Sequence, residues 1–156
     1  LSTCGLTEKF DKLAALNLQL TLSVSLHAPD DDTRNMLMPV NRKRGVAELY
    51  SACDRYFEKT GRRISFEYAM IDGVNDTPEH ARMLAENIRK IGGHVNLIPL
   101  NHVDERRFEP SKPENMKKFI DILQKSGVNV TVRRKLGGDV DASCGQLRRK
   151  MAHSES

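Results

Sequence analysis

The feature that most constrains the fold is an alternation of short β-prone apolar runs with longer segments of helical period. The runs occupy residues 19–26, 63–71, 94–100 and 128–133. Their starts lie roughly 30 to 45 residues apart, which is the length that a right-handed βαβ crossover needs. The sequence therefore predicts an α/β fold with a parallel sheet or part of a βα barrel.

The segments between these runs have the ends expected of helices. Gly61 is expected to end the first helix, because glycine adopts the left-handed conformation that closes helices. Thr77, which precedes a proline, is expected to begin the second helix. Ser111 and Glu114 have the spacing of a capping box and predict the start of the third helix, which Gly127 ends. Three helices are thus predicted, one in each crossover.

The charge of the chain favours contact with phosphate groups without the excess of a histone-like protein. Lysine and arginine number 25 against 21 acidic residues, giving a net charge of +4. The basic residues form four short clusters at 42–44, 106–107, 133–135 and 148–150, which suit a nucleic-acid backbone or a solvated surface. No apolar run approaches the ~20 residues of a membrane helix.

The remaining composition predicts a single cytoplasmic domain. Three widely spaced cysteines form neither a disulfide framework nor a metal-ligand pattern, which indicates a reducing compartment. We expect residues 1–150 to form one folded body and residues 151–156 to be a frayed tail. Leu1 falls inside what reads as the end of a strand, so the chain is expected to begin in the middle of a protein.

Polar residues follow the predicted strands, and in parallel α/β folds ligands gather at that edge. His27, directly after the first run, is either a ligand-binding imidazole or a histidine hydrogen-bonded to a loop. Ser2 and Asn101 are either turn formers or hydrogen-bond donors to a small molecule. Glu67 lies in mid-strand, where an acid is costly unless paired, so it is either a partner for an arginine or a ligand contact. His80, in the first turn of a helix, is expected to be exposed.

Cys144 lies in the run GGDVDASCGQL, at residues 137–147, which is rich in small residues and poor in packing material. Two arginines after the cysteine favour its thiolate, and two aspartates before it oppose the thiolate. The segment reads as a loop that presents a thiol to a reaction partner. Cys53, by contrast, lies on the apolar face of a predicted helix and is expected to be an inert core residue.

Five strings carry a resemblance to a known family. They are LSTCG, SVSLHAPDDDTRNMLMPVN, FEYAMIDGVNDTPEHA, VNLIPLN and VTVRRKLGGDVDASCGQLR, in this order from residue 1 to about residue 149. Together they resemble the radical-SAM methyltransferases that modify C2 of adenine in 23S ribosomal RNA and in certain tRNAs. The resemblance implies the C-terminal half of a partial (βα)6 radical-SAM barrel plus a C-terminal extension.

The same resemblance implies the cofactors and the site. The cofactors are S-adenosylmethionine and a [4Fe-4S] cluster whose CxxxCxxC ligands lie in an N-terminal half, so no metal ligand is expected in this chain. A fragment lacking that half is expected to be inactive. Cys144 matches the cysteine that becomes S-methylated. The positions that match S-adenosylmethionine contacts are Ser2, Ser25, Leu26, His27 and Asn101.

In the mechanism that the resemblance implies, one S-adenosylmethionine methylates Cys144 and a second yields a radical that activates this methyl group for transfer to adenine. The implied partners are 23S rRNA, tRNA and a flavodoxin-type electron donor. The implied protein is a monomer without membrane contact. Two alternatives stay open: a methyltransferase of the same superfamily acting on adenine C8, and a non-catalytic half-barrel that binds RNA or another ligand.

Overall fold

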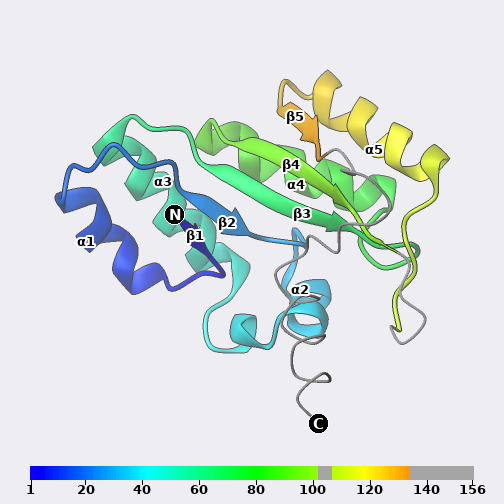
Figure 1. Ribbon diagram of the computed structural model, residues 1–156, viewed down its shortest axis with the longest axis horizontal. Helices are drawn as coiled ribbons and strands as arrows, with labels where there is room; N and C mark the ends of the chain where they lie inside the picture. Colours follow the sequence, from blue (N-terminus) through cyan, green and yellow to red (C-terminus); the bar gives the residue numbers. More distant parts are fainter. Residues whose placement is uncertain (102–106, 134–156) are drawn as a thin grey trace, which may run out of the picture.

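The computed structural model describes residues 1–101 and 107–133 and contains a five-stranded sheet (Figure 1). The strands lie in sequence order, and every neighbouring pair is parallel. The predicted parallel α/β fold is thus confirmed. The strands are β1 (Ser2–Thr3), β2 (Ser23–Ser25), β3 (Ser65–Met70), β4 (His94–Pro99) and β5 (Asn129–Val132).

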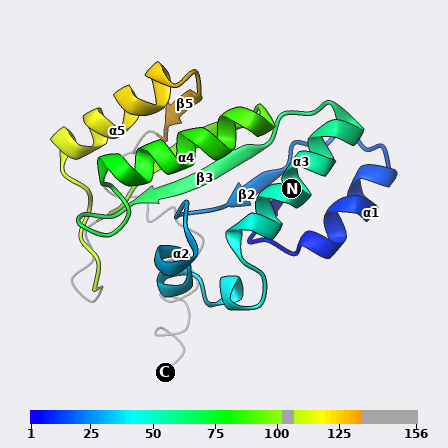
Figure 2. The same ribbon diagram turned by 180° about the vertical axis from the view of Figure 1, so that it is seen from behind.

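The three predicted helices cover one face of this sheet, as the two opposite views show (Figures 1 and 2). They are α3 (Val46–Thr60), α4 (Pro78–Ile91) and α5 (Pro113–Lys125). None of the helices in the described part of the chain is long and apolar enough to cross a membrane. The sequence did not predict four short elements: η1 (Thr7–Lys9), α1 (Phe10–Ala15), α2 (Asp31–Leu37) and η2 (Pro39–Arg42).

Of the four predicted helix starts and ends, three hold and the capping box does not; the third that holds is Gly127, which follows the C-cap of α5 with φ of +82°. The Thr77 side chain accepts a hydrogen bond from the His80 amide, as an N-cap residue should. Gly61 ends α3 with φ of +63°, in the left-handed region. At α5, however, Lys112 is the N-cap and makes no side-chain cap. The Ser111 hydroxyl instead donates to Asp76 over 2.6 Å, because this tertiary partner is available in the fold.

The core lies between the sheet and these helices. Along β3, Phe66, Tyr68 and Met70 are fully buried and alternate with half-buried residues, as a strand with one covered face requires. Cys53 of α3 is fully buried in the same core, as predicted. Burial raises the pKa of its thiol to about 12, so Cys53 stays protonated and inert.

The opposite face of the sheet carries a row of polar side chains, followed toward the carboxyl ends by Ala69 and Ile98. Side chains of paired residues on neighbouring strands point to the same face of the sheet. The register therefore aligns one row of side chains across β2, β3, β4 and β5. The row consists of Ser25, Glu67, Asn96 and Thr131. This polar row and the carboxyl ends of the strands position the candidate site.

Candidate binding site at the strand ends

The predicted site residues lie around the carboxyl ends of β1, β2 and β4. Ser25 is the last residue of β2, and Leu26 and His27 follow it directly. Ser2 lies in the neighbouring strand β1, and Asn101 is exposed just beyond β4. Because all of these strands are parallel, the fold places the five residues toward the same end of the sheet, where the strands terminate.

A buried arginine holds the ends of β1 and β2 together. Arg34 of α2 is 1% exposed, although arginine is almost never so buried without a partner. Its Nε donates to the Leu26 carbonyl over 3.0 Å, and Nη2 donates to the carbonyls of Ser25 (3.1 Å) and Cys4 (2.9 Å). Arg34 thus fixes the backbone on either side of the predicted binding residues, and sequence pattern alone gave no signal for this role.

The guanidinium is itself held by a polar cluster. Arg34 Nη1 donates to Asn41 Oδ1 over 2.8 Å. The Asn41 amide donates in turn to Asp31 (2.9 Å) and Asn35 (2.7 Å). Hydrogen bonds from Asn41 and from the Val46 amide lower the pKa of Asp31, so this carboxylate is charged at neutral pH. The cluster ties the segment after β2 to the start of α3.

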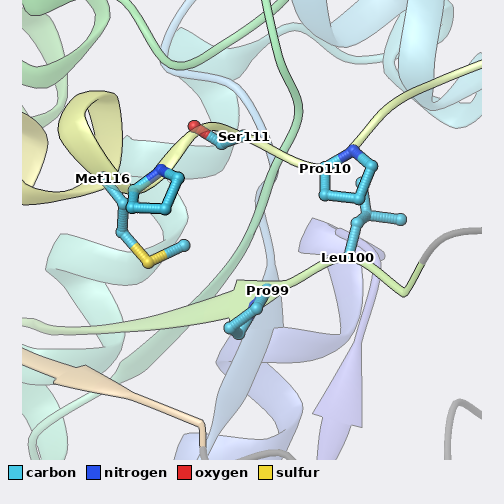
Figure 3. Close-up of a pocket in the computed structure, with 6 residues that line it drawn as sticks. Pro99, Leu100, Pro110, Ser111 and Met116 are labelled. Carbon is cyan, nitrogen blue, oxygen red and sulfur yellow. The ribbon is translucent and has the colours of Figure 1, made fainter.

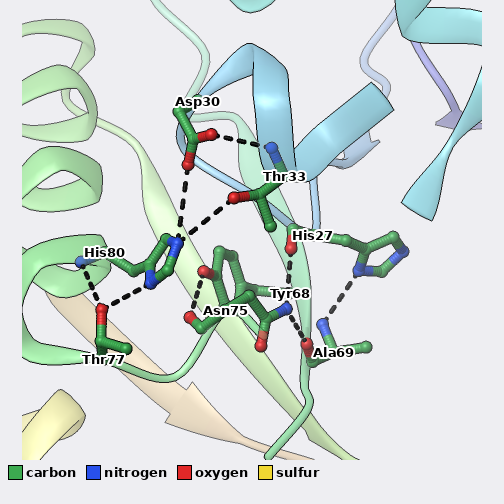
Figure 4. A network of polar contacts seen from close by, with 8 residues as sticks. All are labelled: His27, Asp30, Thr33, Tyr68, Ala69, Asn75, Thr77 and His80. Carbon is green, nitrogen blue, oxygen red and sulfur yellow. Dashed lines mark hydrogen bonds and ion pairs between the residues drawn. The ribbon is translucent and has the colours of Figure 1, made fainter. Parts of the chain in front are cut away.

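His27 has an unusual backbone conformation, and one of its ring nitrogens accepts a hydrogen bond within the fold. Its φ of +60° lies in the left-handed region, which costs a non-glycine residue free energy. The Ala69 amide of β3 donates to His27 Nδ1 over 2.9 Å (Figure 4). Since Nδ1 accepts, the neutral ring carries its proton on Nε2. Both readings left open by the sequence are compatible with this geometry, because Nδ1 is structural and Nε2–H is available as a donor.

Burial keeps this imidazole neutral. Desolvation, followed by the charge of Arg34, lowers the pKa of His27 from 6.5 to about 4. A nearby cation and a poorly solvated site both oppose protonation. His27 is therefore an uncharged Nε2–H donor at physiological pH.

The half-buried, neutral His27 should make the protein less stable in mild acid. Below pH 6.5 the unfolded chain binds a proton at His27, whereas the folded chain does so only near pH 4. Stability is then lost as pH falls through this window, by up to ~3 kcal/mol from this one residue. The measurement is urea unfolding of wild type and His27→Asn between pH 7.5 and 4.5.

Asparagine is a suitable replacement at this position because it tolerates the left-handed backbone and offers an oxygen near the place of Nδ1. The wild type should lose stability relative to His27→Asn as the pH falls, and the difference between them should be constant above pH ~7. The same pH dependence in both proteins would contradict the assignment.

The DGVND motif, residues 72–76, has a structural role at this end of the sheet. Asn75 is fully buried, and its amide donates to the carbonyls of His27 (2.8 Å) and Ala69 (2.6 Å) (Figure 4). Its Oδ1 accepts from the Ile71 amide, and its carbonyl accepts from the Tyr68 hydroxyl. Because every polar group of the Asn75 side chain is used within the fold, this residue positions His27 and has no capacity left for a ligand.

The prediction that His80 is exposed is wrong. The start of α2 packs against this side chain and covers it. Nδ1 lies 2.6 Å from the Thr77 hydroxyl, and Nε2 lies 3.3 Å from the Thr33 hydroxyl and 3.6 Å from Asp30 Oδ2 (Figure 4). The side chain is only 15% exposed. The contacts link α4 to the N-terminus of α2, so His80 is a structural residue.

Three of the predicted residues keep unengaged polar side chains. Within the described residues, the side chains of Ser2, Ser25 and Asn101 make no hydrogen bond. Leu26 differs, because its side chain is fully buried in the core and its amide and carbonyl are bonded to Glu67 and Arg34. The groups available to a ligand are thus three side chains and His27 Nε2–H.

A pocket of about 210 Å³ lies nearby but on the helix-covered side of β4 (Figure 3). Its only hydroxyl, that of Ser111, already donates to Asp76. None of the predicted site residues lines it, so we do not assign it to the site. The lining residues are Pro99, Leu100, Pro110, Ser111, Pro113 and Met116.

The remaining predictions concern a metal site, the Cys144 thiol and the basic clusters. No three His, Cys, Asp or Glu side chains in the described ranges gather to hold a metal ion. Cys144, the extension around it and the tail at 151–156 lie outside the described residues. Of the first basic cluster, Arg44 is engaged with Glu8, Glu48 and Thr7.

No family model matches the chain. A protein of Desulforamulus reducens named "Probable dual-specificity RNA methyltransferase RlmN" is 53% identical over 150 residues, which is 96% of this chain and 43% of that protein. A protein of the same name from Clostridium tetani is 47% identical over 156 residues, which is 100% of this chain and 45% of that protein. The chain spans less than half the length of these curated relatives.

Solved structures agree with these relatives. A radical SAM methyltransferase from Sphaerobacter thermophilus superposes with a TM-score of 0.87 at 47% identity, over 93% of this chain and 42% of that one. A domain of a pyruvate-formate lyase-activating enzyme from Bacteroides vulgatus has a TM-score of 0.67 at 19% identity, which bears on the fold alone. The family resemblance predicted from the motifs is therefore confirmed: this chain is a homologue of the RNA methyltransferases named RlmN and of a radical SAM methyltransferase.

Proposed function

We propose that this chain is part of a radical-SAM RNA methyltransferase. The full-length protein, as the term is used below, has the length of the relatives and contains this chain. Its product is adenine methylated at C2 in 23S rRNA and in tRNA. The observation that carries the proposal is the match of 45–53% identity to named RNA methyltransferases over nearly the whole chain. In that protein the chain supplies half of the barrel and the methyl-carrier cysteine, Cys144.

The strand-end residues suit S-adenosylmethionine, which combines an adenine, a ribose diol and an amino-acid group. Ser2, Ser25 and Asn101 can donate or accept hydrogen bonds, and His27 can donate through Nε2. A neutral His27 places no second positive charge beside a cationic sulfonium ligand. Arg34 and Asn75 hold these residues without contacting the ligand themselves.

When bound, S-adenosylmethionine and a reduced [4Fe-4S] cluster supply the methyl group and the radical chemistry that the weakly reactive C2 of adenine requires. The described residues offer no ligand set for a cluster, so we assign its ligands to no residue of this chain. The part of this chain in the reaction is to bind and orient the adenosyl ligand and, through Cys144, to carry the methyl group.

Exposed basic residues beyond the strand ends support RNA as the partner. Arg42 and Lys43 follow α2, Arg107 lies in the segment after β4, and Arg133 follows β5 directly. None of these four forms an ion pair with another described residue, so their charges are available to phosphate groups. The proposal further includes a flavodoxin-type electron donor, a monomeric state and a location in the cytoplasm.

The test is methylation of RNA by the anaerobically reconstituted full-length protein with S-adenosylmethionine and a reducing system. Mass spectrometry of the digested nucleosides should detect 2-methyladenosine, and peptide analysis should detect a methyl group on Cys144. An 8-methyladenosine product would instead support the C8 alternative. RNA binding without either product would support the non-catalytic half-barrel.

A further inference from the structure

The polar row of the sheet includes a carboxylate whose hydrogen-bonding capacity is only partly used by the described residues. Glu67 lies in the middle of β3 and is half-buried on the face that carries this row. The Asn96 amide donates to its Oε2 over 3.0 Å, and its Oε1 has no hydrogen-bond partner within the described residues. One carboxylate oxygen is thus fixed, and the other remains able to accept hydrogen bonds.

A directed row of side chains orients the amide that holds Glu67. The Thr131 hydroxyl donates to Asn96 Oδ1 over 3.2 Å, so the Asn96 amide nitrogen must face Glu67. His94 Nε2 lies 2.8 Å from the same hydroxyl and donates to it, because the hydroxyl proton is already used. Each bond of the row points its donor toward the carboxylate, which polarises the row in one direction.

Among the described residues, Glu67 has no arginine partner of the kind that the sequence left open. None of the ion pairs among the described residues involves it. A half-buried carboxylate with one neutral donor on Oε2 keeps Oε1 as an acceptor for water or for a ligand. A ligand that offers hydrogen-bond donors can use this oxygen.

The position of Glu67 connects it to the proposed adenosyl site. In the sheet register Glu67 is the direct neighbour of Ser25, on the same face. Its carbonyl accepts the amides of Leu26 (3.0 Å) and His27 (3.3 Å), so its backbone is fixed to the segment that carries the predicted ligand contacts. A ligand held by Ser25 and His27 therefore lies within one strand spacing of this carboxylate.

We propose that Glu67 binds the ribose hydroxyls of the adenosyl ligand, with Asn96 as the residue that positions its carboxylate. A carboxylate is an acceptor only, and a vicinal diol supplies donors; acidic side chains bind ribose hydroxyls in this way in other α/β folds. The proposal rests on the proposed function only in taking S-adenosylmethionine as the ligand.

The test measures binding without turnover. S-adenosylhomocysteine and its 2′-deoxy and 3′-deoxy analogues are titrated calorimetrically into the full-length protein and into Glu67→Gln. Wild type should bind the ribose form about 10- to 100-fold more tightly than at least one deoxy analogue, the range expected for a charge-assisted hydrogen bond. Glu67→Gln should lose most of this preference and bind the deoxy analogue as wild type does.

Two further variants make the test specific. Glu58→Gln removes an exposed carboxylate from α3 and should keep the wild-type preference for the ribose. Asn96→Ala leaves the charge of Glu67 but removes the amide that holds it, and should reduce the preference by a smaller factor. If Glu67→Gln does not fold, the Asn96→Ala result decides the question.

The outcomes separate this inference from the proposed function. If wild type binds S-adenosylhomocysteine and Glu67→Gln retains the full ribose preference, the role of Glu67 is overturned while the adenosyl site stands. An unchanged ribose preference in Asn96→Ala would likewise overturn the positioning role of Asn96. If wild type binds none of these ligands, the proposed function fails first, and the inference about the ribose fails with it.

Discussion

Replacement of Cys144 by alanine is expected to abolish RNA methylation by the full-length protein. The proposed role of this residue is covalent: its sulfur accepts a methyl group and presents that group to adenine. Alanine has no atom that can form the bond, and serine would offer an oxygen that is a poor nucleophile at its ordinary pKa. Among the described residues predicted for the site, Ser2, Ser25, Leu26, His27 and Asn101, none carries a thiol.

The measurement is nucleoside mass spectrometry of RNA incubated with wild type, Cys144→Ala and a control. Cys4→Ala is a suitable control, since Cys4 is an exposed cysteine directly after β1 and only its backbone carbonyl contacts Arg34. Cys4→Ala should methylate RNA as wild type does. Binding of S-adenosylhomocysteine should survive in both variants. Normal amounts of methylated adenine from Cys144→Ala would refute the carrier role.

Replacement of Arg34 by methionine is expected to cost more stability than any other single change considered for the described residues. The variant leaves three backbone carbonyls and the Asn41 side chain without their donor; the contacts of Leu26 and Asn41 are buried, and those of Cys4 and Ser25 are half-buried. Each unsatisfied buried acceptor costs about 1–3 kcal/mol, so the summed loss is roughly 4 kcal/mol or more. The thermal unfolding midpoint should fall by roughly 10 °C.

Two comparisons distinguish this effect from simple loss of charge. Arg34→Lys keeps the charge but cannot reproduce the planar set of donors, so it should lie between methionine and wild type. Arg89→Met, an exposed arginine near the end of α4, should change stability by no more than ~1 kcal/mol. If Arg34→Met unfolds at the temperature of Arg89→Met, the carbonyls of β1 and β2 do not depend on Arg34. Since Arg34 also lowers the pKa of His27, that pKa should rise in Arg34→Met.

The strand and helix pattern could be predicted because it depends on local properties of the chain. The apolar periods of α3, α4 and α5 and the runs that became β3 and β4 are strong over many residues. The shortest elements were missed or overextended: the run at 19–26 formed only Ser23–Ser25, and α2 was not predicted. Helices of six or seven residues contain too few turns to show a period, and their stability comes from tertiary contacts.

The sequence by itself determined the alternation of strands and helices along the chain, the parallel sheet, the polar character of the strands' carboxyl ends, and the motifs that identify the family. Only the tertiary structure decided what the individual polar residues do. Arg34 became a backbone clamp, Asn75 a support for His27, and Glu67 a partly used acceptor, because each role depends on atoms distant in sequence. Hydrogen-bond partners are chosen by three-dimensional proximity and burial, and neither quantity is encoded in the local pattern of residues.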